Sequence, residues 1–198
     1  MIIRSVRFAT SGARPSEYPS DGWPQIAFAG RSNVGKSSLI NALVQHRKLA
    51  FTSRVPGRTQ RINFFAINDS FYFVDLPGYG YARAPRSVQA QWRPMIESYL
   101  EGNSSLRCVF VLVDARRELA DSDLQLLNYL RANGVPAKIV ATKIDKLSAN
   151  RGARQMAAIR RKLEGNRIYE EPFPFSATSR EGRDALLKEI ATMAPASS

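Results

Sequence analysis

A glycine-rich segment with a lysine and a serine at its end is the part of this sequence best suited to chemistry. It matches the pattern G-x-x-x-x-G-K-[ST] and reads Gly30, Arg31, Ser32, Asn33, Val34, Gly35, Lys36, Ser37, followed by Ser38. The glycines allow a tight loop whose backbone N–H groups converge on phosphate oxygens, next to a helix N-terminus. Lys36 would neutralise the β- and γ-phosphates, and the Ser37 hydroxyl would coordinate Mg²⁺. The pattern predicts a nucleoside triphosphate site, with ATP and GTP still open.

Two further segments contain groups that could respond to the γ-phosphate. One is a D-x-x-G element made of Asp75, Leu76, Pro77 and Gly78. Its carboxylate would hold a water on Mg²⁺, and its glycine would begin a loop that rearranges when the phosphate leaves. The other is a polar loop segment made of Gly57, Arg58, Thr59, Gln60 and Arg61. The Thr59 hydroxyl could complete the Mg²⁺ shell, although the same residue also reads as an ordinary surface threonine.

The choice of base depends on two segments that follow predicted strands. The first consists of Thr142, Lys143, Ile144 and Asp145. The Asp145 carboxylate can accept hydrogen bonds from guanine N1–H and from its exocyclic amine, a donor pair that adenine lacks, and the Lys143 stem can lie across the base. The second consists of Phe175, Ser176 and Ala177, where a backbone N–H could donate to guanine O6. Together they predict GTP as the ligand.

Alternating apolar and amphipathic stretches predict the elements that must position these residues. Strands are expected at residues Gln25–Ala29, Ile62–Ile67, Phe71–Val74, Cys108–Val113, Ala137–Ala141 and Phe173–Phe175, with helical patterns between most of them. The turn residues Asn68, Asp69 and Ser70 predict a hairpin. The expected fold class is α/β: a three-layer P-loop domain whose mostly parallel six-stranded sheet has one antiparallel strand, at its edge, and helices on both faces.

Length and composition favour one cytoplasmic domain. The 198 residues fit a single nucleotide-binding domain, 1–198, with an N-terminal extension at 1–24 and a disordered tail at 194–198. We expect a monomer without membrane association, because no apolar run approaches the length of a membrane span and the N-terminus lacks a secretory signal. The single cysteine, Cys108, lies in a predicted buried strand, as expected in a reducing compartment.

The net charge of +12, from 29 basic and 17 acidic residues, favours a phosphate-rich partner. Nucleic acid is the leading candidate, and simple solubility is the alternative. One basic group lies in and around the predicted switch segments: Arg47, Lys48, Arg54, Arg58, Arg61, Arg83, Arg86 and Arg93. A second group follows Asp145, where a merely solvated helix face is an equally good reading: Arg151, Arg154, Arg160, Arg161 and Lys162.

With these motifs in this order, the sequence resembles the translation-factor-related GTPases and, more closely, the EngB (also YihA or YsxC) family of bacterial ribosome-biogenesis GTPases. The resemblance covers nearly the whole chain, and its marks are Gly30–Ser37, Pro56–Gln60, Asp75–Tyr81 and Thr142–Leu147. It implies a Mg²⁺-dependent molecular switch that hydrolyses GTP to GDP and phosphate during assembly of the large ribosomal subunit. It also implies a link with normal cell division and septation.

Two residues depart from the general GTPase pattern. Thr142 replaces a common asparagine, as the EngB family resemblance implies, and the lost amide would weaken base binding. Tyr79 stands where many small GTPases have a glutamine that positions water, so intrinsic hydrolysis should be slow. We expect Lys36, Thr59 and Gly78 to contribute to catalysis together with Asn33.

Asn33 leaves two readings open, because its side chain could coordinate a K⁺ ion against the phosphates or brace the loop. The first reading resembles the potassium-activated members of the wider class. The whole chain also allows more than one function. It could be a ribosome- or RNA-binding protein that holds GTP or GDP structurally, without useful turnover. A P-loop ATPase or small-molecule kinase is disfavoured by Asp145 and by the lack of an inserted acceptor-binding lid.

Overall fold

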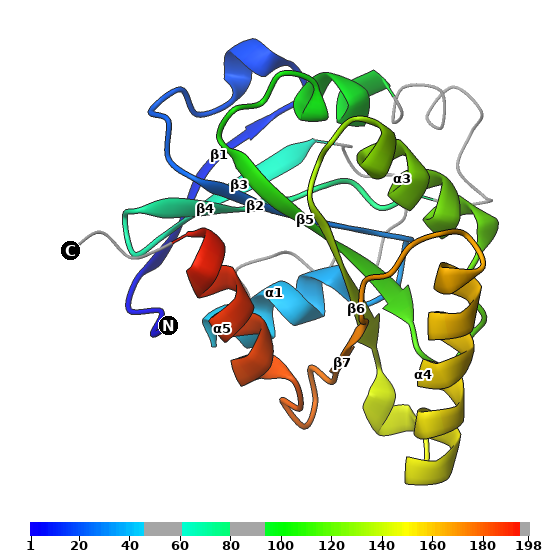
Figure 1. Ribbon diagram of the computed structural model, residues 1–198. Coiled ribbons are helices and arrows are strands. Elements are labelled where there is room, and N and C mark those ends of the chain that lie inside the picture. The colour runs from blue at the N-terminus through cyan, green and yellow to red at the C-terminus, as the bar shows by residue number, and fades with distance from the viewer. Residues whose placement is uncertain (46–60, 80–93, 195–198) are drawn as a thin grey trace.

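The predicted apolar runs form a twisted sheet between two layers of helices (Figure 1). The computed structural model describes residues 1–45, 61–79 and 94–194. Six strands match the predicted ones to within two residues at each end: β2 Gln25–Gly30, β3 Ile62–Ile67, β4 Phe71–Asp75, β5 Leu106–Asp114, β6 Ala137–Thr142 and β7 Phe173–Phe175. The α/β class and the mostly parallel sheet are therefore confirmed.

The prediction of six strands was wrong, because the N-terminal segment adds strand β1 Val6–Gly12. The strand order is β1-β3-β4-β2-β5-β6-β7, so β1 is the edge and β3 lies inside the sheet. β3 runs antiparallel to both β1 and β4, which confirms one antiparallel strand but not its place at the edge. The strand was missed because it is an edge strand with Phe8 56% exposed, so it lacks a continuous apolar run.

The predicted hairpin between β3 and β4 is confirmed. Asn68 and Asp69 have φ angles of 51° and 47°, a left-handed pair that suits the twist of a tight hairpin. The Asn68 side chain also accepts hydrogen bonds from the backbone N–H groups of Arg4, at 2.7 Å, and Ser5, at 3.2 Å. The turn thus fixes the start of β1 as well as its own two strands.

Helices cover both faces of the sheet, as expected (Figure 1). Helices α1 Lys36–Val44 and α5 Arg183–Met193 pack with Ile26 and Phe28 of β2 on one face. On the other face, Ala27 and Ala29 face the core that includes α3 Asp121–Ala132, α4 Ala149–Glu164 and helical residues 94–100. Short 3-10 helices are η1 Pro15–Glu17 and η2 Ile144–Lys146. β2 is the fourth of the seven strands, and all six of its residues are buried.

Both chain ends contribute to these layers within the described residues. Ala194, the first residue of the expected tail, is buried beside α5, and residues 195–198 lie outside the described part of the chain. Among the helices that the structure describes, none has the length and apolar character needed to cross a membrane.

The parallel strands β4, β2, β5, β6 and β7 end at one edge of the sheet, where an open α/β sheet commonly binds its ligand.

Candidate nucleotide site

The phosphate-binding loop between β2 and α1 is held from two sides. On the D-x-x-G side, the Ser32 N–H donates to the Tyr79 carbonyl at 2.9 Å and the Tyr79 N–H donates to the Gly30 carbonyl at 3.3 Å. On the opposite side, Lys143 Nζ donates to the Asn33 carbonyl at 2.6 Å. These contacts join three predicted motifs around the start of α1.

Gly78 lies so close to the phosphate loop that a side chain would not fit without movement. A Cβ atom built there would lie 3.1 Å from Ser32 Oγ and 3.3 Å from Ser32 N. The D-x-x-G segment can therefore lie against the loop because its last residue is glycine. The backbone of Gly78 is thereby held beside the segment predicted to bind phosphates.

The charged pair Lys36 and Asp75 joins the phosphate loop to the D-x-x-G segment. The Lys36 ammonium donates a charge-assisted hydrogen bond to Asp75 Oδ1, and the two side chains are only 11% and 12% exposed. Asp75 and the hydroxyl of Ser37, the residue after Lys36, offer hard oxygen ligands of the kind that Mg²⁺ takes. Within the described residues, no group of three or more His, Cys, Asp or Glu side chains could form a complete metal cage. This donor set fits an ion that takes its remaining ligands from water and phosphates.

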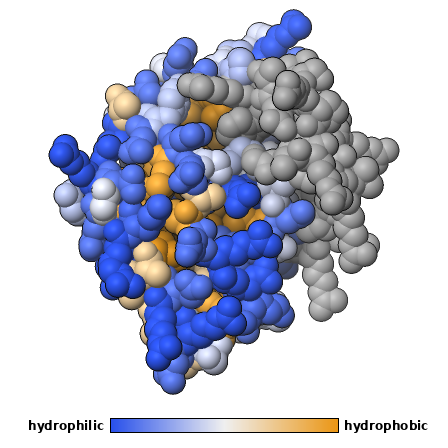
Figure 2. All heavy atoms as spheres, turned by 90° about the vertical axis from the view of Figure 1, so that its right-hand side faces the viewer, coloured by the Kyte–Doolittle hydropathy of each residue, from blue (hydrophilic) through white to orange (hydrophobic). Residues whose placement is uncertain are grey.

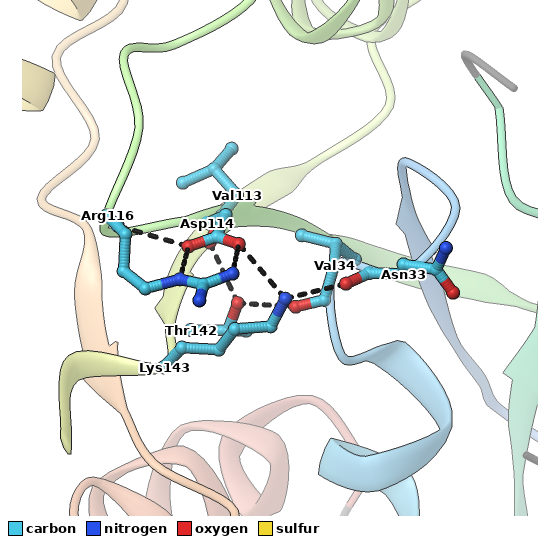
Figure 3. A network of polar contacts seen from close by, with 7 residues as sticks. All are labelled: Asn33, Val34, Val113, Asp114, Arg116, Thr142 and Lys143. Atoms are coloured by element: carbon cyan, nitrogen blue, oxygen red, sulfur yellow. Dashed lines mark hydrogen bonds and ion pairs between the residues drawn. The ribbon is translucent and has the colours of Figure 1, made fainter. Parts of the chain in front are cut away.

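Thr142 links the base-side motif to the phosphate loop (Figure 3). Its Oγ1 lies 2.7 Å from the Val34 carbonyl and 3.0 Å from the Val113 carbonyl, so its one hydroxyl hydrogen can be donated to either. The residue is 3% exposed. A threonine hydroxyl therefore connects the phosphate loop to β5 at the position where the general pattern has an asparagine.

Asp114 at the end of β5 is a member of the site that sequence reasoning missed. Its carboxylate accepts hydrogen bonds from Arg116 Nε at 2.9 Å, Arg116 Nη2 at 2.8 Å and Lys143 Nζ at 3.0 Å (Figure 3). Burial alone would raise the pKa of Asp114, but these donors hold the pKa well below its usual range. The signal that could have found it is an aspartate at the end of a buried strand, at the same sheet edge as the other motifs.

Asp145 and the segment Phe175–Ala177 meet on the base side of the site. A hydrogen bond from Ser176 lowers the pKa of Asp145, against the opposing effect of burial, and Lys146 Nζ adds an ion pair at 3.3 Å. Ser176 is fully buried, and its Oγ accepts hydrogen bonds from the N–H groups of Thr178 and Ser179. Asp145 is therefore an ionised acceptor at neutral pH, which is the state needed to bind two guanine donors.

Tyr79 faces the protein core instead of the phosphate site. The side chain is 5% exposed, and its hydroxyl donates to Asp123 Oδ1 in α3 at 2.8 Å. Burial against α3 thus satisfies both the ring and the hydroxyl of Tyr79. In this position the hydroxyl cannot take the role of a water-positioning glutamine. Slow intrinsic hydrolysis stays a prediction.

The structure describes most, but not all, of the predicted site residues. Arg31 pairs through its backbone with Tyr79, and Arg61 turns toward β1, where its guanidinium donates to the Ser11 carbonyl at 3.2 Å. Ser38, Leu76, Pro77 and Ile144 belong to the same segments as the residues above. The predicted residues that lie outside the described part of the chain are Gly57, Arg58, Thr59 and Gln60, together with Arg47, Lys48, Arg54, Arg83, Arg86 and Arg93 of the basic group.

Known proteins share both the sequence and the fold. A family model described as 50S ribosome-binding GTPase matches residues 25–143. A probable GTP-binding protein EngB of Geobacter sp. (strain M21) is 53% identical over 190 residues, covering 96% of this chain and 88% of that protein. Another, from Geobacter sulfurreducens, is 54% identical over 188 residues, covering 95% and 90%. A crystal structure of a probable GTP-binding protein EngB has a TM-score of 0.70 at 25% identity, covering 85% of this chain and 97% of that one.

Proposed function

The chain belongs to the EngB family of GTP-binding proteins and is a P-loop GTPase, and from this premise we propose that its GTP form binds the large ribosomal subunit during assembly. Hydrolysis of GTP to GDP and phosphate would then end the contact. The observation that carries this proposal is the match of residues 25–143 to the family described as 50S ribosome-binding GTPase. The net charge of +12 supports a partner rich in phosphate. A role in cell division and septation is part of the same proposal.

Each motif has a proposed role in GTP binding. The phosphate loop would enclose the β- and γ-phosphates, and Asp145 would read the guanine. A GTPase of this kind uses Mg²⁺ with its nucleotide, and we assign Ser37, Asp75 and Thr59 to that ion. The ion would neutralise charge that develops on the phosphates. Lys36 and Asp75 contact each other in this structure. A bound phosphate would take the place of Asp75 beside Lys36, and Mg²⁺ would take the place of Lys36 beside Asp75.

Single-turnover phosphate release separates this switch from a protein that holds GTP only structurally. We expect slow release by the protein alone, because no water-positioning glutamine follows Gly78, and clearly faster release with large ribosomal subunits. The matched arm contains small ribosomal subunits at the same concentration. A rate of phosphate release that large subunits do not change would favour a protein that holds GTP only structurally.

The same assay tests whether K⁺ acts at Asn33. The Asn33 side chain is exposed, makes no hydrogen bond with any residue the structure describes, and points away from Lys143 (Figure 3). This geometry supports an ion ligand over a brace within the loop. An arginine finger contributes about 10³ to 10⁵ in rate, so a K⁺ ion that partly replaces one should make hydrolysis at least about tenfold faster in KCl than in NaCl. Asn33→Ala should abolish the difference, and a difference that survives this substitution would exclude the role.

A further inference from the structure

Helix α4 presents a row of cations on its outward face. Arg151, Arg154, Arg161 and Lys162 are all exposed, whereas Gly152, Ile159 and Leu163 are buried on the opposite side. At about 100° per residue, these four cations fall within one third of the helix circumference. With a rise of about 1.5 Å per residue, the row is roughly 16 Å long. These four residues are called the α4 cation row below.

None of these four side chains has a hydrogen bond or an ion pair with a residue that the structure describes. Neighbouring cations do have partners. Arg160, on another side of the same helix, pairs with Glu171, and Lys138 pairs with Glu170 and Glu189. The only acidic residue within α4 is Glu164, at its last position. The positive charge of the row is therefore not neutralised by the described part of the protein.

The chemistry of the α4 cation row fits a phosphate backbone better than a protein or a membrane. Guanidinium groups, which make up most of the row, bind phosphate with paired hydrogen bonds. The large hydrophobic residues that are exposed in the described chain are Ile2, Phe8 and Tyr169, and α4 contains none of them. The row thus lacks the apolar anchors of a protein hot spot and the apolar face of a membrane-bound helix. Figure 2, which faces the side where α4 lies in Figure 1, shows mostly hydrophilic residues over its lower part.

The position of α4 connects this row to the base-reading segment and not to the γ-phosphate. The helix begins directly after η2, which contains Asp145. Gly152 lies beside this segment, since a Cβ atom there would be in van der Waals contact with Ile144 Cδ1, at 3.4 Å. GTP and GDP carry the same base, so this segment would meet the same group in both states. Contact through α4 should not distinguish them.

From this arrangement we propose that the α4 cation row binds the backbone phosphates of double-stranded RNA, with the same strength in the GTP and GDP states. The proposal rests on the proposed function in that the RNA would be ribosomal. Paired RNA suits a rigid row of cations because its backbone is regular and is recognised mainly by shape and phosphate contacts. The row would contribute the same affinity for RNA in both nucleotide states, and contacts elsewhere in the protein would add the dependence on the nucleotide.

The test is a titration of a mixed-sequence RNA duplex with the full-length protein, followed by fluorescence anisotropy across a range of KCl concentrations. The variant Arg154→Gln/Arg161→Gln removes two charges from the row. We expect about tenfold weaker binding or more, and a fall of about 2 in the slope of log affinity against log salt. The change should be equal with GDP and with a non-hydrolysable GTP analogue.

The matched control Arg4→Gln/Lys188→Gln also removes two positive charges, from exposed positions in the segment before β1 and on α5. It should change duplex affinity much less. Equal weakening by both variants, or no weakening by the α4 variant, would overturn the proposal. Measurements of melting temperature and GDP affinity serve to check that both variants fold.

Sedimentation with ribosomal subunits separates this inference from the proposed function. If the wild type fails to sediment with large subunits in any state, the proposed function fails while the duplex titration still reports on α4. If the wild type sediments and the α4 variant does so equally well at matched salt, the inference about α4 is wrong and the proposed function stands.

Discussion

Replacing Asp145 with asparagine should weaken GTP binding by about 10² to 10⁴-fold and create a preference for xanthosine triphosphate. Hydrogen bonds to a charged acceptor are each worth about 1.5–3 kcal/mol; the asparagine oxygen can keep only one of the two, without its charge, while the amide NH2 opposes the guanine amine. The asparagine amide would instead donate to the carbonyl that xanthine has in place of the guanine amine. The Ser176 hydrogen bond moves the pKa of Asp145 further below neutral, so the wild type should hold its guanine preference throughout the neutral pH range.

The measurement is the affinity of both nucleotides for the wild type and the variant. Asp184→Asn is a suitable control, since it removes the same charge from a side chain that is 98% exposed at the start of α5. That control should leave the base preference unchanged. If Asp145→Asn also keeps its preference for GTP, then Asp145 does not read the base.

Replacing Gly182 with alanine should lower the free energy of unfolding by about 3 kcal/mol or more and weaken nucleotide binding as well. Gly182 precedes α5 with a φ angle of 78°, and a Cβ atom there would lie 2.0 Å from the Pro174 carbonyl oxygen. The backbone must shift to relieve this contact. The same turn holds the Ser176 N–H against the Glu181 carbonyl at 3.1 Å, so the shift would reach the base-binding segment.

Gly134→Ala is the matched control for this substitution. Gly134 has a φ angle of 65°, but nothing lies within 4 Å of its added Cβ. Alanine there should cost only the backbone strain of about 1–2 kcal/mol. Urea unfolding of both variants isolates the effect of the close contact. Equal losses in the free energy of unfolding at the two positions would show that the contact of the added Cβ with Pro174 does not destabilise the fold.

The sequence predicted the parts of the fold that depend on continuous apolar runs and on turn chemistry. Strands β2 to β6 each have a largely apolar and largely buried run, β7 consists of three apolar residues, and Asn68 with Asp69 specified the hairpin. Strand β1 could not be found in this way, because an edge strand with Phe8 exposed has no such run. Its pairing with β3 depends on residues at least 50 positions away in the chain, from Val6 with Ile67 to Gly12 with Ile62.

The candidate site was predicted at the level of motifs but not of contacts. The order of the motifs along the chain placed the phosphate loop, Asp75 and Asp145 at one sheet edge. It could not reveal that Asp114 joins Arg116 and Lys143, because that network depends on the register of β5 with β6. It also could not reveal that Tyr79 turns into the core, since its partner Asp123 lies 44 residues away.

The central claim is that GTP controls binding to the large ribosomal subunit, and co-sedimentation in defined nucleotide states tests it most directly. The protein is loaded with a non-hydrolysable GTP analogue, with GDP or with no nucleotide, and is pelleted with purified large subunits at one salt concentration. We predict a clear excess in the pellet for the GTP-analogue state over the other two, and no such excess with small subunits. The same pelleted fraction in all three states would contradict a GTP-controlled switch.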